Sequence, residues 1–396
     1  MKMVEPEASA QELVPPVHPP DPEAMARTRA RLDRLVKPPG SLGVLEELAV
    51  RLAGIAGEAP PPVPDKKALL VFAGDHGVVA QGVSAYPAWV TARMVSVFMQ
   101  GGAAISVLAR HLSAQLWVAD VGVADASEDA PAAFPEGAPA LVRKPMSPVA
   151  GVGEDCPGPP AEGAASPDRP ILVTIRIRPG TRDFTREPAM TRDEAGRAFL
   201  AGRELLRRAA SAGARLIGVG EMGIGNTTAA SALIAALTGT DPARVVGPGT
   251  GLDAAGVERK VRVVRQALQR HRPGPHDPLG ALAAVGGLEI AALAGALLEA
   301  ASLRIPAVLD GFVVGAAAVV AAALSPQAPA YWLAGHRSAE PGHRLALAHL
   351  GLRPLLELDM RLGEATGAAL ALPIVEAAAR LCREMWTLEQ AGVTPP

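Results

Sequence analysis

The chain has 396 residues, a formal net charge of -2 and only 3% aromatic residues. A charge so close to neutral gives no electrostatic basis for binding nucleic acid. The 2 cysteines form no CxxC pair, which indicates neither a disulfide framework nor a thiolate zinc site. Because the N-terminus is polar and the apolar windows are shorter than a membrane span, we expect a cytoplasmic protein without membrane contact.

The N-terminal part of the sequence predicts a tail followed by short helices. Residues 1–23 are polar and rich in proline, and we expect a disordered tail there. Residues 24–35 suit a short helix, which the sequence Lys-Pro-Pro-Gly-Ser at 37–41 ends, and leucines at helical spacing predict another helix after it. We expect residues 24–66 to form a small helical domain together with residues 355–396.

Residues 67–354 carry short apolar strands that alternate with helices, and Gly101 and Gly102 predict a break in the helix expected at 90–109. This alternation predicts a large α/β domain with a three-layer, Rossmann-like architecture, in which helices cover both faces of a mostly parallel sheet. Proline-rich residues 126–170 interrupt the pattern. We expect them to be a disordered surface insertion without packed elements of its own.

Asp75 and His76 directly follow an apolar strand expected at 68–72. Ligands bind outside the carboxyl ends of parallel strands, so both residues are candidates for a site. Alternatively, Asp75 caps a loop and His76 bonds to the backbone. The residues alone leave both interpretations open.

The stretch 214–238 is the most informative part of the chain. Its apolar residues 214–217 predict a buried strand, and the glycines between 218 and 225 predict a turn after it. Asn226 and Thr227 suit the start of the next helix. A glycine-rich turn that leads into a helix N-terminus presents free N–H groups and the positive end of the helix dipole, which predicts a phosphate site.

Glu221, Lys260 and Glu364 are the candidate chemical groups. Both glutamates lie in glycine-rich segments next to apolar runs, where burial would raise the pKa of a carboxyl and make it a usable base near neutral pH. The alternatives are that each glutamate is solvated or compensates a helix dipole, and that Lys260 is an ordinary surface charge.

Residues Gly218–Gly223 match the pattern G-x-G-x-x-G, which is typical of dinucleotide-binding oxidoreductases. However, Glu221 would then lie close to a pyrophosphate, and the helix is expected to begin only after Gly225. No lysine follows these glycines as a Walker A motif requires, and the histidines lack metal-ligand spacing. We therefore expect no metal site and no other cofactor.

Many short motifs, taken together and in order, resemble the nicotinate-nucleotide–dimethylbenzimidazole phosphoribosyltransferase family over roughly residues 30–382. The matching segments are Lys37-Pro-Pro-Gly-Ser-Leu-Gly, Gly74-Asp-His-Gly-Val, Val83-Ser-Ala-Tyr-Pro, Gly101-Gly-Ala-Ala-Ile, Pro188-Ala-Met-Thr, Gly220-Glu-Met-Gly-Ile-Gly-Asn-Thr-Thr, Gly249-Thr-Gly with Lys260, Asp310-Gly, Gly335-His-Arg-Ser-Ala-Glu and Gly363-Glu-Ala-Thr-Gly-Ala.

The resemblance implies a metal-independent reaction. Nicotinate mononucleotide would give its phosphoribosyl group to 5,6-dimethylbenzimidazole with inversion, producing α-ribazole 5′-phosphate and nicotinate in cobalamin nucleotide-loop assembly. Glu364 would be the general base and Glu221 would lie at the ribose or reacting centre. The resemblance also implies a homodimer. The expected substrate-binding residues are Ser84, Tyr86, Met222, Gly223, Gly225, Asn226, Thr227, Lys260, Gly363 and Thr366.

Arg93 and Pro248 depart from residues that are usual in the family. The resemblance therefore does not settle the contacts of Arg93 with the acceptor or the role of the second glycine turn, which contains Pro248. The sequence also leaves three alternatives in function. These are the same transfer to another base such as adenine or a phenolic acceptor, an NAD-dependent oxidoreductase that uses Gly218–Gly223, and a binding protein without catalysis.

Overall fold

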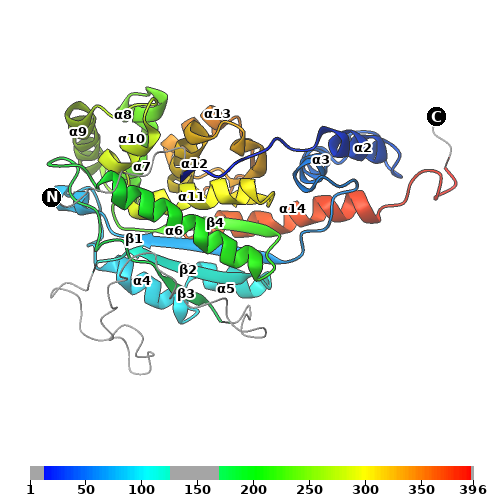
Figure 1. Ribbon diagram of the computed structural model, residues 1–396, viewed down its shortest axis with the longest axis horizontal. Helices are drawn as coiled ribbons and strands as arrows, with labels where there is room; N and C mark the ends of the chain where they lie inside the picture. Colours follow the sequence, from blue (N-terminus) through cyan, green and yellow to red (C-terminus); the bar gives the residue numbers. More distant parts are fainter. Residues whose placement is uncertain (1–12, 125–168, 394–396) are drawn as a thin grey trace, which may run out of the picture.

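The computed structural model describes residues 13–124 and 169–393, and a 7-stranded parallel sheet lies at its centre (Figure 1). The strand order is β3-β2-β1-β4-β5-β6-β7, and each neighbouring pair is parallel. This confirms the expected α/β fold. The strands are β1 (Lys67–Gly74), β2 (Gln115–Gly122), β3 (Ile171–Thr174), β4 (Leu216–Met222), β5 (Ala307–Leu309), β6 (Trp332–His336) and β7 (Pro354–Leu356).

Helices cover both faces of the sheet because its central strands are apolar on both sides. In β1, Leu70 and Phe72 pack into one core, while Leu69 and Val71 pack into the other. The helices of the first layer include α6 (Arg192–Ser211), α7 (Asn226–Thr238), α8 (Pro242–Val245), α9 (Ala254–His271), α10 (Pro278–Val285), α11 (Leu288–Ser302), α12 (Phe312–Leu324) and α13 (Pro341–Leu350). The opposite layer contains α4 (Val90–Met99), α5 (Ala104–His111) and the first half of α14 (Thr366–Glu384).

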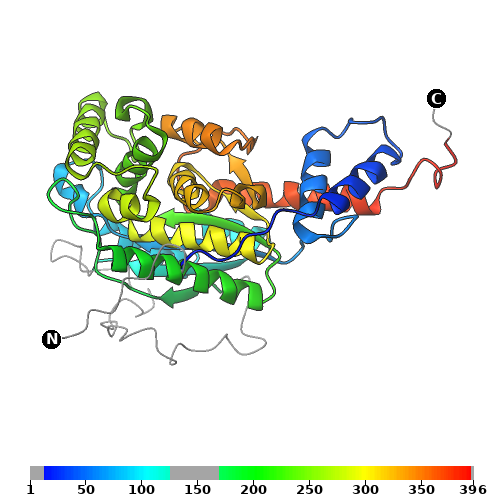
Figure 2. The same cartoon turned by 45° about the horizontal axis from the view of Figure 1, so that its top comes forward.

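Glycines let α6 and α11 cross in close backbone contact above the sheet. A Cβ atom on Gly202 of α6 would lie 1.7 Å from the carbonyl oxygen of Ala292, and one on Gly295 of α11 would lie 1.9 Å from that of Phe199. The two helices run side by side in Figures 1 and 2. Their small residues therefore set the spacing of this layer.

Strand β4 is longer than the sequence pattern predicts. Gly218 and Gly220 lie inside the strand and not in the turn after it. The reason is packing: a Cβ on Gly218 would lie 2.7 Å from Leu69 Cδ2, and one on Gly220 would lie 1.9 Å from the backbone nitrogen of Ala365. These glycines accommodate the start of α14 against the sheet, so the glycine-rich turn is confined to Gly223 and Gly225.

The predicted tail at 1–23 is only partly described, because residues 1–12 lie outside the described ranges, as does most of the expected insertion at 126–170. The described part from residue 13 packs on the body of the molecule. Leu13 is buried, Arg203 Nη1 donates to its carbonyl oxygen at 2.6 Å, and Tyr331 Oη donates to the carbonyl oxygen of His18 at 2.7 Å.

A small helical unit lies at one end of the molecule (Figure 2). It consists of α2 (Pro22–Asp33), α3 (Val44–Ala56) and the far end of α14, with a core of its own that includes Leu32, Leu35 and Cys382. Helix α14 thus links this unit to the sheet. Strand β7 pairs with β6, so the expected start of the small domain at residue 355 falls within a strand of the large sheet.

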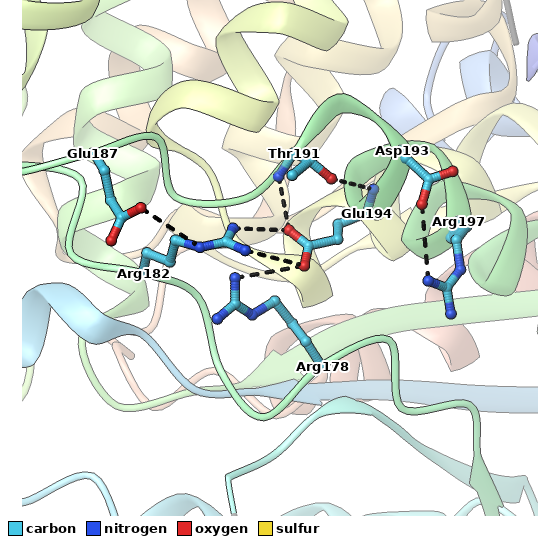
Figure 3. Close-up of polar contacts among 7 residues, drawn as sticks. All are labelled: Arg178, Arg182, Glu187, Thr191, Asp193, Glu194 and Arg197. Atoms are coloured by element: carbon cyan, nitrogen blue, oxygen red, sulfur yellow. Dashed lines mark hydrogen bonds and ion pairs between the residues drawn. The ribbon is translucent and has the colours of Figure 1, made fainter. Parts of the chain in front are cut away.

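A network of ion pairs fixes the loop between β3 and α6 (Figure 3). Thr191 and Glu194 form a capping box at the start of α6. The Glu194 carboxylate also lies 2.9 Å from Arg182 Nη1 and 3.5 Å from Arg178 Nη1. The loop from residue 181 in turn accepts a hydrogen bond from Gly77, just after β1. This network therefore supports a strand end that faces the site.

Segment Val90–His111 has 22 residues and contains an 18-residue window with a mean hydropathy of 1.4, so by length and composition alone it is a candidate membrane span. Its helix is interrupted, because α4 ends at Met99 and α5 begins at Ala104, as the paired glycines at 101 and 102 predict. About 33% of the window is buried inside the chain. Phe98 and Ile105 are buried in the core, whereas Val107 is 51% exposed.

Candidate active site

A cavity of about 390 Å³ opens at the carboxyl ends of the central strands. Strands β1 and β4 are neighbours there, and the chain leaves them toward opposite edges of the sheet. This is the switch point at which parallel α/β sheets bind their ligands. A second hollow of about 490 Å³ lies between α2 and α3 in the small helical unit, away from these strand ends.

Glu221 is held at the end of β4 on the wall of this cavity. Its carboxylate is buried and accepts a hydrogen bond from Asn226 Nδ2, the first residue of α7. Burial raises the pKa of Glu221 well above its ordinary value, and the nearby carboxylates of Glu289, Asp310 and Glu364 raise it further. These effects favour the protonated form of the carboxyl, whereas the hydrogen bond from Asn226 favours the ionised form.

Glu364 faces the same cavity from the turn before α14. Its backbone N–H donates to the carbonyl oxygen of Glu221 at 3.1 Å, which ties the turn to β4. Burial raises the pKa of Glu364 to about 7, and the negative charge of Asp310 contributes to this rise. The group can therefore accept a proton at neutral pH, as a general base must.

Gly363 is required by the close approach of these two acids. Its φ is +84°, in the region that favours glycine, and a Cβ there would lie 2.6 Å from Glu221 Oε1. Thr366, three residues later, closes the turn, because its hydroxyl donates to the carbonyl oxygen of Gly363 at 2.7 Å.

Lys260 is fully buried behind the cavity on α9. Its ammonium group donates to Thr227 Oγ1 at 2.7 Å and to the carbonyl oxygen of Gly247 at 3.3 Å. Burial lowers the pKa of Lys260 to about 8, and the charge of Glu340 opposes this effect. The lysine therefore keeps its charge at neutral pH, under the start of α7.

The mouth of the cavity is apolar on the side of α4. Tyr86 and Met222 line it with Val90 and Met94, and Tyr86 is 53% exposed. Ser84 is set back from the cavity wall, where its hydroxyl accepts the backbone N–H of Tyr86 at 3.2 Å. A flat apolar ring would fit between these side chains.

Most of the expected site residues line one cavity, and the rest support it from behind. The lining residues are Glu221, Glu364, Tyr86, Met222, Gly223, Asn226, Thr227 and Gly363. The supporting residues are Ser84, Gly225, Lys260 and Thr366. Asp75 and His76 are buried beneath the site: Asp75 accepts the N–H of Ala124 at 2.8 Å, and His76 Nε2 lies 2.7 Å from Glu289 Oε1.

Several cavity residues were not assigned a role from the sequence. The main ones are Val90, Met94, Thr250, Gly311, Phe312, His336, Ser338, Glu340 and Arg361. Two of them lie shortly after strands, since Gly311 follows β5 and Ser338 follows β6 with one residue between. Within the described ranges, no group of three or more His, Cys, Asp or Glu side chains is arranged to hold a metal ion.

Comparisons with known proteins show the family of this chain. A family model described as Phosphoribosyltransferase matches residues 17–393. The chain belongs to this phosphoribosyltransferase family. The nicotinate-nucleotide–dimethylbenzimidazole phosphoribosyltransferase of Salinispora tropica is 50% identical over 377 residues, which cover 95% of this chain and 97% of the relative.

Solved structures show the same phosphoribosyltransferase fold. The crystal structure of CobT from Thermus thermophilus matches with a TM-score of 0.81 and 46% identity, covering 95% of this chain and 100% of that one. The nicotinate-nucleotide–dimethylbenzimidazole phosphoribosyltransferase of Chloroflexus aurantiacus is 46% identical over 384 residues, which cover 97% of this chain and 98% of the relative. The similarity therefore extends over both the sheet and the small helical unit.

Proposed function

We propose that this chain transfers the phosphoribosyl group of nicotinate mononucleotide to 5,6-dimethylbenzimidazole with inversion, giving α-ribazole 5′-phosphate and nicotinate. The names of the relatives support the substrates. The observation that carries the mechanism is the buried Glu364 carboxyl, whose pKa of about 7 suits a general base at neutral pH.

Glu364 is the proton acceptor in this proposal. A ring nitrogen of the benzimidazole attacks the anomeric carbon of the ribose, and the C–N bond to the nicotinate ring breaks. The electron pair of that bond returns to the pyridinium nitrogen, so nicotinate departs with a neutral ring. The N–H proton of the acceptor passes to Glu364, and no metal-bound group is required in these steps.

Glu221 lies beside the anomeric carbon in this arrangement. Asn226 orients its carboxyl group and favours its ionised form, while the surrounding carboxylates favour the protonated form. Positive charge that develops on the ribose ring would attract the ionised form of Glu221. We therefore assign it to stabilising the oxocarbenium character of the transition state.

The phosphate group is best supported at the starts of α7 and α12. Both helices begin at the cavity without a side-chain cap, after Gly225 and Gly311, so the positive ends of their dipoles lie at it. In α7 the N–H groups of Asn226 and Thr228 already donate to the carbonyl oxygens of Gly223 and Gly225. The buried charge of Lys260 adds to this positive end through Thr227. The start of α14 is less suited, because the Asp310 carboxylate already accepts several of its N–H groups.

The acceptor ring is assigned to the apolar mouth between Tyr86, Met222 and Met94. A benzimidazole is flat and mostly apolar, so it would remove these side chains from water without leaving a polar group unpaired. Adenine and phenolic acceptors have similar size. A panel of acceptors, each assayed for nicotinate release, ranks them directly.

An oxidoreductase that uses Gly218–Gly223 is not supported. Gly218 and Gly220 are buried within β4 under α14, so they cannot approach a pyrophosphate.

The deciding experiment for the proposed transfer is incubation with nicotinate mononucleotide and dimethylbenzimidazole, followed by mass analysis. We expect α-ribazole 5′-phosphate and an equal amount of nicotinate. Saturable binding of both substrates without product would instead favour a binding protein and contradict the proposal.

We also propose that the enzyme is a cytoplasmic homodimer. We place Val107 of α5, whose apolar side chain is 51% exposed, in the association surface. The glycine interruption between α4 and α5 argues against a continuous membrane span.

A further inference from the structure

The turn that carries Glu364 has an unusual backbone. Gly363, Glu364 and Ala365 have consecutive φ values of +84°, +62° and +64°. The left-handed region disfavours residues with a Cβ atom, because the Cβ then lies too close to the following carbonyl oxygen. Two such residues in succession persist only where the surroundings hold them. The start of α14 therefore needs an external support.

That support is the carboxylate of Asp310, which directly follows β5 and is 1% exposed. Its Oδ2 accepts the N–H of Ala365 at 3.1 Å, and its Oδ1 accepts those of Gly367 at 2.7 Å and Ala368 at 3.1 Å. Helix α14 has no capping side chain of its own. Asp310 thus acts as its N-cap from another part of the chain.

The same carboxylate faces Glu364 across the corner of the cavity. Its negative charge raises the pKa of Glu364 beyond the effect of burial. The other charged or titratable groups around this corner are Glu221 from β4, Glu289 from α11, His336 from β6, His343 from α13, and Glu340 and Arg361 on the cavity wall. Asp310 lies between them, with its Oδ1 at 3.5 Å from His336 Nε2.

We propose that Asp310 is a positioning residue that holds the left-handed turn and thereby sets both the aim and the basicity of Glu364. This inference rests on the proposed role of Glu364 as the base. Asp310 itself contacts neither substrate in this arrangement, because it lies behind the turn. Its effect on turnover is transmitted through the backbone N–H groups and through its charge.

The test is Asp310→Asn, a change that keeps the shape but removes the charge and one acceptor. We expect turnover to fall about 10-fold or more, because the amide group would face an N–H donor. We also expect the acid limb of the pH–rate profile to move to lower pH by about 0.5 or more, because the pKa of Glu364 falls without a negative neighbour.

Glu299→Gln is the matched control. Glu299 is a buried carboxylate of α11, paired with Arg203 and Arg207 away from the cavity. This variant should lose stability but keep the acid limb of the wild type. A loss of turnover in Asp310→Asn with an unmoved limb would overturn the proposal, because a purely structural cap has that signature. Wild-type turnover would overturn it as well.

Ala365→Gly keeps the test decisive if Asp310→Asn does not fold alone. Glycine adopts a φ of +64° without strain, so the turn depends less on Asp310 in this background. We expect Asp310→Asn to fold in the Ala365→Gly background and to move the acid limb of the pH–rate profile to lower pH. An acid limb at the same pH as in Ala365→Gly alone contradicts the inference. Glu364→Gln distinguishes failure of the Asp310 proposal from failure of the proposed base. If this variant still shows the acid limb of the wild type, Glu364 is not the base.

Discussion

Glu221 and Glu364 show how single residues acquire different properties from their surroundings. Both carboxyls are buried at one cavity, and burial raises the pKa of each. Glu221 also receives a hydrogen bond from Asn226, whereas Glu364 lies on a strained turn beside Asp310. The separate roles that we propose, Glu364 as the base and Glu221 as the stabilising carboxylate, therefore follow from the groups around each one.

Gly363→Ala tests the close packing of these two acids. The new Cβ would lie 2.6 Å from Glu221 Oε1, so the turn or the carboxylate must move. We expect turnover to fall about 10-fold or more, since small displacements of catalytic groups have large effects. Gly351→Ala is the control, because it has a similar φ of +65° with no atom within 4 Å of its Cβ. An equal loss of turnover in both variants would show that backbone strain, and not the contact with Glu221, causes the loss.

At the scale of elements, the spacing of α6 and α11 depends on the close contacts of Gly202 and Gly295. In Gly202→Ala the added Cβ would lie 1.7 Å from the carbonyl oxygen of Ala292, so the helices must separate. We expect the free energy of unfolding to fall by about 1–3 kcal/mol or more, measured by urea denaturation.

Gly196→Ala on the same helix is its matched control. There the added Cβ would lie 3.4 Å from Leu13 Cδ1, which is ordinary contact. We expect stability to stay the same or rise by up to about 1 kcal/mol, because alanine favours helices. If both substitutions destabilised the protein equally, the close crossing of α6 and α11 would not be the cause.

The sequence predicts elements well where the pattern is local. Alternation of strands and helices predicts the parallel sheet, and the paired glycines predict the interruption between α4 and α5. The expectation of a turn at Gly218 and Gly220 is wrong, because both glycines are required by contacts distant in sequence: Gly218 packs against Leu69, and Gly220 against Ala365. The support of Glu364 by Asp310 is not predictable from the sequence either. These residues are far apart in the chain, and only the order of the strands in the folded sheet brings them together.

At the scale of the whole molecule, the buried acids link activity to stability. The folded chain holds a proton on Glu364 up to about pH 7, whereas the ordinary pKa is 4.5. Because the folded state binds this proton more tightly, stability is highest at low pH for this group and is lost as the pH rises from 4.5 to about 7. Glu221 acts in the same direction.

Glu364→Gln should therefore be more stable than the wild type at pH 8, by up to about 3 kcal/mol, because it carries no buried charge. The advantage should shrink as the pH is lowered toward 5. Thermal unfolding of the two proteins side by side measures this difference. An advantage that is independent of pH would contradict the raised pKa of Glu364.

The proposed homodimer makes a separate prediction for the assembly. Light scattering on the eluting protein should give twice the chain mass of 40.5 kDa. Val107→Glu on α5, whose side chain is 51% exposed, should shift the mass toward one chain if this segment is the interface. A single-chain mass for the unchanged protein would rule out the dimer.

The most direct test of the central claim is the pH–rate profile of Glu364→Gln beside the wild type, with nicotinate release as the signal. For the wild type we predict a rate that rises through about pH 7 and then levels off, because the base must be ionised. For the variant we predict a loss of about 10²-fold or more and no such rise. A variant with wild-type turnover, or with the same rise through neutral pH, would contradict the account.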